Sequence, residues 1–195
     1  MNLLAISGSV RAGSYNRALL EAMSQLCPEG VSITIYDHIK DIPVFNADVA
    51  DDDIPESVEL LISKMRECDG VIISTPEYAH GVPGALKNAL DWLVSTDALI
   101  LKPVVVTSVS TSGLGGVRSH SPLVLILSAM NSNVVVEGSI NVPYAQRKFD
   151  ENNMLIPLFG EDSIHFDNVN ASNYELLAED PETLENLIPS LVGMA

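Results

Sequence analysis

A glycine-rich stretch near the N-terminus contains residue types that bind phosphate. Residues 8–16 follow the apolar run 3–6, and their glycines allow the backbone to turn its N–H groups inward. The hydroxyls of Ser9 and Ser14 add hydrogen-bond donors, and the start of the next helix adds partial positive charge. We therefore expect an anion-binding loop, with an ordinary turn in which Ser14 caps the helix as the alternative.

The two common nucleotide motifs that begin in this way are both incomplete here. A P-loop would continue after Gly13 with Lys and Ser or Thr, but this chain has Ser14 and Tyr15, so a triphosphate would lack its lysine. The dinucleotide-binding fingerprint requires a glycine where Val10 stands. A single terminal phosphate is the ligand that still fits.

Two further stretches have unusual loop compositions. Residues 75–84 contain two prolines and two glycines, which stiffen a loop whose Tyr78 is suited to flank a flat heteroaromatic ring. His80 has no positioned Ser, Cys or carboxylate in a recognisable catalytic pattern. Residues 110–116 are mostly small, so that a ring or a ribityl chain would lie against the backbone. Taken singly, each loop also fits an ordinary turn.

The hydrophobic pattern places all three loops at one edge of a sheet. Short β-rich runs alternate with helical patterns, and this predicts an α/β fold with a doubly wound, parallel, five-stranded sheet in the order 2-1-3-4-5 and helices on both faces. In this topology ligands bind beyond the carboxyl ends of strands one, three and four. The expected strands are residues 3–6, 31–36, 70–74, 103–108 and 134–137.

The length of 195 residues suits one domain, residues 1–195. Periodicity weakens beyond residue 140, so residues 141–173 are expected to be irregular surface chain, followed by short helices at 174–178 and 181–191. Residues 151–195 form an acidic C-terminal extension with nine acidic residues and no Lys or Arg.

Composition narrows the classes of partner. A net charge of −16 argues against a nucleic-acid partner, because binding to the phosphate backbone requires clustered Lys and Arg. No apolar run has the length of a membrane span, and the N-terminus has no basic leader, so we expect a cytoplasmic protein without membrane contact. Cys27 and Cys68 are expected to be free thiols, and no metal-ligand spacing is present.

Four motifs together resemble the NAD(P)H-dependent FMN reductases of flavodoxin-like fold, which include quinone, chromate and azo-dye reductases. The sequence departs from the family at Ala79, where Asn is frequent, and at His80, where a small residue is common. The motifs are Gly8-Ser9-x-Arg11-x-x-Ser14-x-Asn16, Thr75-Pro76-Glu77-Tyr78, Gly81-x-Pro83-Gly84-x-Leu86-Lys87-Asn88-Ala89-x-Asp91-Trp92 and Gly113-x-Gly115-Gly116-x-Arg118.

The resemblance implies a flavoprotein oxidoreductase with FMN as cofactor and NADPH or NADH as co-substrate. By a ping-pong mechanism it would reduce a small acceptor such as a quinone, free flavin, azo compound or chromate, and it would be a homodimer or homotetramer. No catalytic side chain is expected, because the flavin carries the chemistry. The implied cofactor-binding residues are Ser9, Arg11, Ser14, Tyr15 and Asn16 near the phosphate, Pro76, Glu77, Tyr78, Ala79, His80 and Gly81 along the isoalloxazine, and Ser110, Ser112, Gly113, Gly115 and Gly116 on its other side.

Three points stay open on the sequence alone. A flavodoxin-like one-electron carrier would use the same fold and FMN without oxidising NAD(P)H, and a non-catalytic flavin-binding protein is the other alternative. Arg11 is suited either to the FMN phosphate or to the phosphate of the incoming nicotinamide nucleotide. Asp91, four residues after Lys87, is expected to form a surface ion pair with it, whereas Lys87 also suits a subunit contact.

Overall fold

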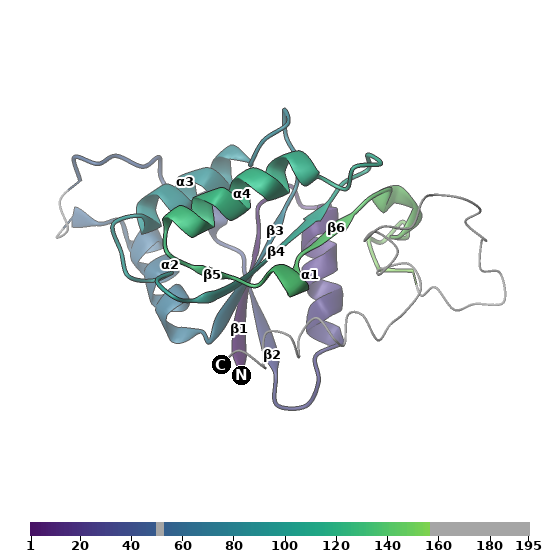
Figure 1. Ribbon diagram of the computed structural model, residues 1–195, viewed down its shortest axis with the longest axis horizontal. Coiled ribbons are helices and arrows are strands. Elements are labelled where there is room, and N and C mark those ends of the chain that lie inside the picture. Colours follow the sequence, from purple (N-terminus) through teal and green to yellow (C-terminus); the bar gives the residue numbers. More distant parts are fainter. Residues whose placement is uncertain (50–52, 157–195) are drawn as a thin grey trace.

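The structure, a computed structural model, describes residues 1–49 and 53–156 (Figure 1). The helices expected at residues 174–178 and 181–191, and most of the acidic extension 151–195, lie outside the described residues. A single domain through residue 195 therefore stays a prediction.

The described strands form one parallel sheet with the predicted strand order. The order is β2-β1-β3-β4-β5, and β6 also pairs with β4. The carboxyl ends of β1, β3 and β4 therefore lie side by side, which confirms the predicted position of the three loops. The strands are β1 (Asn2–Ser7), β2 (Ser32–Tyr36), β3 (Gly70–Thr75), β4 (Pro103–Val109), β5 (Asn133–Val134) and β6 (Ile140–Val142).

The prediction of one uninterrupted fifth strand at residues 134–137 was wrong. Val136–Gly138 is a 3-10 helix, η3, in which Ser139 N–H bonds to Val136 C=O, so these groups leave the sheet. The outer edge of β4 is instead covered by two short pieces: β5 pairs with its beginning and β6 with its end. Local turn formation thus overrides the β propensity of the valine run.

The described part of the stretch 141–173 is only partly the irregular surface chain that was expected, because three of its apolar residues are buried. Val142, Ala145 and Phe149 are buried in the same apolar cluster as the helix that follows β1. Ala145–Arg147 forms a further 3-10 helix, η4. We call residues 141–153 the rim segment, because they border the candidate site described below.

Helices cover both faces of the sheet, as predicted. Figure 1 shows α2, α3 and α4 gathered on one side and α1 on the other, and the two apolar clusters divide the same way. Alternate residues of each central strand enter opposite clusters, as the period of a strand requires. The helices are α1 (Tyr15–Gln25), α2 (Glu56–Glu67), α3 (Gly84–Leu93) and α4 (Val117–Ala129), with a short 3-10 helix η1 (Ile39–Asp41) after β2.

Cys27 and Cys68 are free thiols, as expected. The expected ion pair between Lys87 and Asp91 forms along α3, at 2.5 Å. Within residues 1–49 and 53–156, no helix combines the length and apolarity of a bilayer span. The same residues contain no group of three His, Cys, Asp or Glu side chains arranged to hold a metal ion.

A row of buried hydroxyl groups crosses the α1 face of the sheet near its carboxyl edge. Ser7, Ser74 and Thr107 lie in register on β1, β3 and β4. The buried side chain of Asn16, on the first turn of α1, lies over this row: Ser74 Oγ donates to its Oδ1 at 2.9 Å. The same amide exchanges two 3.0 Å hydrogen bonds with the backbone of Val109 at the end of β4. The start of α1 is thereby fixed to β3 and β4.

Thr107 is the exception in this row. Its side chain is 0% exposed, and its Oγ1 has no hydrogen-bond partner among the described residues. Because an unpaired buried hydroxyl carries an uncompensated desolvation cost, we expect Thr107→Val to raise the free energy of unfolding by about 1 kcal/mol, measured by urea denaturation. Ser74→Ala, which removes a made bond, should lower it by about 1 kcal/mol. A destabilised Thr107→Val variant would show that the hydroxyl is paired.

Candidate functional site

Three loops meet at the carboxyl edge of the sheet: the first loop, residues 8–14 after β1, the second loop, residues 76–83 after β3, and the third loop, residues 110–116 after β4. Ser9 Oγ and Tyr78 Oη lie 3.0 Å apart and join the first loop to the second. The backbone N–H of Gly8 bonds to Ser74 C=O at 2.8 Å. A Cβ at position 8 would lie 2.9 Å from a methyl group of the buried Leu86, so a larger residue would require that side chain to move.

The start of α1 is open to an anion. Ser14 occupies the N-cap position in extended conformation, but its hydroxyl bonds to no helix N–H, and the first turn contains no acidic residue. Ser14 is therefore the N-cap residue by position, as the alternative had it, but its side chain does not pair with the N–H groups of the helix. The N–H groups of the first turn keep their partial positive charge for a ligand, and the nearly buried Ser14 hydroxyl lies beside them.

The other predicted residues of the first loop differ in what they present. Ser9 Oγ contacts Tyr78 and accepts from the backbone N–H of Arg11 at 3.3 Å. The exposed Arg11 side chain donates to Gly13 C=O at 2.6 Å. The Asn16 side chain points into the sheet, so the group that it offers a ligand is its backbone N–H.

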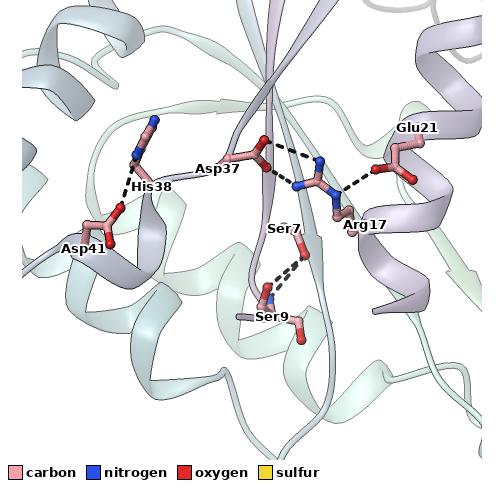
Figure 2. Close-up of polar contacts among 7 residues, drawn as sticks. All are labelled: Ser7, Ser9, Arg17, Glu21, Asp37, His38 and Asp41. Carbon is pink, nitrogen blue, oxygen red and sulfur yellow. Dashed lines mark hydrogen bonds and ion pairs between the residues drawn. The ribbon is translucent and has the colours of Figure 1, made fainter. Parts of the chain in front are cut away.

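The basic residue at the beginning of α1 is already paired. Figure 2 shows the Arg17 guanidinium between Asp37, at the end of β2, and Glu21 on α1. Two carboxylates therefore neutralise Arg17, and it is not a free cation for a phosphate. The same view shows Ser9 folded back on Ser7, whose Oγ accepts from Ser9 N–H at 3.3 Å.

The second loop contains a strained two-residue turn. Tyr78 and Gly81 exchange two backbone hydrogen bonds, at 3.2 and 3.0 Å. Ala79 and His80 between them have φ angles of 50° and 61°, the left-handed region in which Asn and Gly are favoured. Such conformations cost of order 1–3 kcal/mol per residue and persist where surrounding contacts enforce them. The turn leaves Tyr78 half exposed, with its hydroxyl fixed on Ser9.

Glu77 connects the second loop to α4. Its Oε2 accepts from the backbone N–H of Arg118 at 3.1 Å, and its Oε1 lies 3.0 Å from His80 Nδ1. Gly116 at the N-cap of α4 has no side chain, so Glu77 caps this helix from a neighbouring loop. The hydrogen bond from His80, reinforced by the N–H and charge of Arg118, holds the pKa of Glu77 below its ordinary value of 4.5.

The third loop owes its glycines to close packing within the protein. A Cβ at Gly113 would lie 2.6 Å from Tyr144 Oη, and one at Gly115 would lie 3.0 Å from the backbone of Asn141. Both neighbours belong to the rim segment. The small residues of this loop were expected to leave room for a ligand, whereas the side of Gly113 where a Cβ would point faces Tyr144.

The rim segment is the part of the site that the sequence analysis missed. Its backbone bonds to the third loop, since Tyr144 N–H donates to Ser112 C=O at 3.3 Å and Ala145 N–H to Ser110 C=O at 3.0 Å. At its other end Asn153 lies within 3.6 Å of a Cβ placed on Gly13 of the first loop. The segment therefore borders both loops. Its apolar residues Val142, Ala145 and Phe149 were a readable signal of burial, but their spacing does not show which loops they adjoin.

The remaining predicted residues pack against the loops or bond within them. Tyr15 packs its ring against Phe149, with centroids 5.3 Å apart. Pro76 is buried beneath the second loop, and Ser110 Oγ lies 3.0 Å from Ser112 Oγ. All the residues implied by the resemblance therefore lie on the three loops or on the first turn of α1, at one edge of the sheet.

A separate cavity of about 1010 Å³ lies elsewhere, between residues 45–49 and Ile54, α2 and the end of α3. Phe45 and Trp92 form part of its wall, with Arg66 and Asp97 among the charged groups. None of the predicted cofactor-binding residues lines it. The convergence of loops, and not cavity volume, therefore defines the candidate site.

Comparison with known proteins agrees with this geometry. The sequence profile described as NADPH-dependent FMN reductase matches residues 1–147. The chain belongs to the NADPH-dependent FMN reductase family. It is 34% identical over 153 residues to a quinone reductase of Escherichia coli strain K12, which covers 77% of this chain and 81% of that protein. It is 33% identical over 158 residues to an NAD(P)H-dependent FMN reductase of Pseudomonas aeruginosa, which covers 80% of this chain and 85% of that protein.

A solved structure of the same kind has a similar fold. The flavoenzyme NAD(P)H:(acceptor) oxidoreductase of Paracoccus denitrificans superimposes with a TM-score of 0.71 at 26% identity, over 79% of this chain and 85% of that one. The flavodoxin-like fold, the oxidoreductase class and the pairing of FMN with NAD(P)H, all expected from the resemblance, are confirmed.

The residues at the three loops fit FMN. Its single phosphate matches an uncapped helix start flanked by the Ser14 hydroxyl. The flavin ring requires hydrogen-bond donors at its polar edge, and among the described residues the backbone N–H groups of Gly113 and Gly116 donate to no other acceptor.

Glu77 provides a test of how the second loop and α4 are held together. Because its folded pKa is depressed, its carboxylate contributes stability above the unfolded pKa, and this contribution is lost as pH falls through the folded pKa. We expect Glu77→Gln to lower the free energy of unfolding by about 1 kcal/mol at pH 7, with the difference from wild type shrinking below pH 4.5.

Urea denaturation at several pH values measures this difference. Glu29→Gln, at an exposed carboxyl in the turn before β2, is the matched control and should change stability by less than about 0.5 kcal/mol. A Glu77→Gln deficit that persists unchanged into acid would show that shape, and not charge, is what the carboxylate supplies.

Proposed function

We propose that the chain binds FMN with its phosphate on the first loop and its ring between the second and third loops, and uses NAD(P)H to reduce a small acceptor, in the first place a quinone. The observation that carries this proposal is the uncapped start of α1 beside Ser14, joined through Ser9 and Tyr78 to the loop that would flank the ring.

The first loop supports a monophosphate over a longer phosphate chain. Its donors are backbone N–H groups and the Ser14 hydroxyl, which suit one terminal phosphate. Arg17 is neutralised by Asp37 and Glu21, and no lysine lies in the loop. Arg11 is the one cation of the first loop, and its exposed guanidinium would reach either nucleotide by exchanging its hydrogen bond to Gly13 C=O for one to the ligand.

When bound, FMN supplies a ring that accepts a hydride from NAD(P)H and passes reducing equivalents to an acceptor. The protein's part is orientation and electrostatics. Tyr78 is held by Ser9 and presents a half-exposed ring as a wall. The N–H groups of Gly113 and Gly116 form fixed dipoles that stabilise negative charge, an effect worth a few kcal/mol per donor in other enzymes.

The proposed class of electron acceptor follows from the activities of similar proteins. Besides the quinone reductase of Escherichia coli, the chain is 33% identical over 186 residues to an NADH-dependent flavin reductase subunit of Lactobacillus johnsonii. Free flavin is therefore the second acceptor in the proposal, and azo compounds and chromate follow from the resemblance. A ping-pong mechanism is proposed because one open ring face would serve the two substrates in turn. Homo-oligomeric assembly and a cytoplasmic location stay predictions.

Separate half-reactions test this proposal. Under anaerobic conditions, NADH or NADPH should abolish the visible flavin absorbance of the FMN-loaded protein, and menadione added afterwards should restore it. Steady-state rates at varied concentrations of both substrates should give parallel double-reciprocal lines, as expected when one product leaves before the second substrate binds.

Three outcomes would contradict the proposal. Tight FMN binding without bleaching by either nucleotide would favour a one-electron carrier. A protein that takes up no FMN would be a non-flavin member of the fold. Intersecting lines with full activity would retain the reductase but exclude the ping-pong mechanism.

A further inference from the structure

Basic residues are scarce in this chain, and one of them, Arg118, lies at the candidate site. With only 10 Lys and Arg against 26 Asp and Glu, the protein repels free anions overall. Arg17, Lys64, Arg66 and Lys87 are each in close contact with a carboxylate. Arg118 differs from them. It lies in the first turn of α4, two residues after the third loop, and its guanidinium is 3.9 Å from the Glu77 carboxylate.

The Arg118 backbone and side chain have separate roles. The backbone N–H is the group capped by Glu77 Oε2. The guanidinium makes its one close contact among the described residues with His80, whose Nδ1 is 3.1 Å from Nη1. It is 51% exposed, so most of its five N–H donors face solvent at the junction of the second and third loops.

The contact with His80 is a weak restraint on this guanidinium. His80 Nδ1 lies 3.0 Å from Glu77 Oε1 as well as 3.1 Å from Arg118 Nη1. A carboxylate only accepts and a guanidinium only donates, so a single ring nitrogen cannot satisfy both at once. Whenever Nδ1–H donates to Glu77, the guanidinium loses its partner and is available to another acceptor.

The position of His80 is itself enforced. It lies in the left-handed region at a turn position better suited to glycine, and its side chain is 71% exposed. Strain of this kind is retained at ligand-binding loops more often than in ordinary turns. The turn therefore holds an imidazole beside the guanidinium at the outer side of the two loops that would flank the flavin.

We propose that Arg118, with His80 beside it, binds an anionic group of the second substrate, either a carboxylate on the acceptor or a phosphate on the nicotinamide nucleotide. This inference rests on the proposed function, because it places the anion next to the flavin ring. Both sources present the planar or forked oxyanion that a guanidinium recognises with paired hydrogen bonds. In a chain of net charge −16, such a local cation would be needed to offset the general repulsion of anionic substrates.

Calorimetric titration of the purified chain, with and without added FMN, tests the inference without relying on turnover. The probes are benzoate against the neutral, isosteric benzamide, and NADP⁺ against NAD⁺. The variants are Arg118→Ala, Arg118→Lys and His80→Ala. Arg66→Ala is the matched control, because Arg66 is similarly exposed at 56% but lies on α2 and pairs with Asp97.

We expect Arg118→Ala to reduce the benzoate-to-benzamide or the NADP⁺-to-NAD⁺ affinity ratio about tenfold, the effect of losing one charge-assisted pair. Arg118→Lys should restore part of the ratio, since it keeps the charge without the fork, and His80→Ala should lower it by a smaller factor. Arg66→Ala should leave it unchanged. A fall confined to benzoate assigns the site to the acceptor, and one confined to NADP⁺ assigns it to the nucleotide.

The inference would be overturned if both affinity ratios of Arg118→Ala stayed within twofold of those of wild type, whether or not the chain binds FMN. An Arg118-dependent preference for anions in a chain that takes up no FMN would instead overturn the proposed function and leave only the anion site. If Arg118→Ala and Arg66→Ala lower the affinity ratios equally, the cause is the protein's overall charge and not a local site, and the inference is overturned.

Discussion

The side chain of Asn16 is the contact on which the geometry of the site depends most. It is 2% exposed and bonds across 58 residues to Ser74 and across 93 residues to Val109. One amide thus fixes the first turn of α1 to the ends of β3 and β4. Because a buried amide without partners carries a large desolvation cost, this arrangement is strongly preferred over one in which the first loop shifts.

Once α1 is fixed, the loops support one another by direct contact. Glycine at position 8 lets the first loop approach Leu86 and Pro76, and Glu77 carries the connection onward to the start of α4. The rim segment closes the far side through Tyr144 and Asn153. The loops therefore form one connected frame in which backbone N–H groups remain for a ligand, and this preorganisation suits a protein whose cofactor performs the chemistry.

Sequence patterns were sufficient for the features that repeat along the chain. Alternating strands and helices predicted the sheet order, and the switch-point rule then predicted which loops would meet. The same patterns failed where contacts are long-range. Nothing in the first loop shows that Asn16 turns inward, and the cap that Glu77 provides lies 41 residues from Arg118. The edge strand was misread because a local 3-10 turn overrides the β propensity of its valine run. The rim segment was misread because Val142, Ala145 and Phe149 pack against residues far away in the sequence.

The central claim is that the phosphate, held at the uncapped start of α1, anchors the cofactor. The most direct measurement compares equilibrium binding of FMN with that of riboflavin, which lacks only the phosphate, by flavin fluorescence. Two or three charge-assisted hydrogen bonds, together worth about 3 kcal/mol or more, predict that FMN binds at least about 100-fold more tightly. Ser14→Ala should weaken FMN binding and leave that of riboflavin unchanged. Equal affinity for the two flavins would contradict the account.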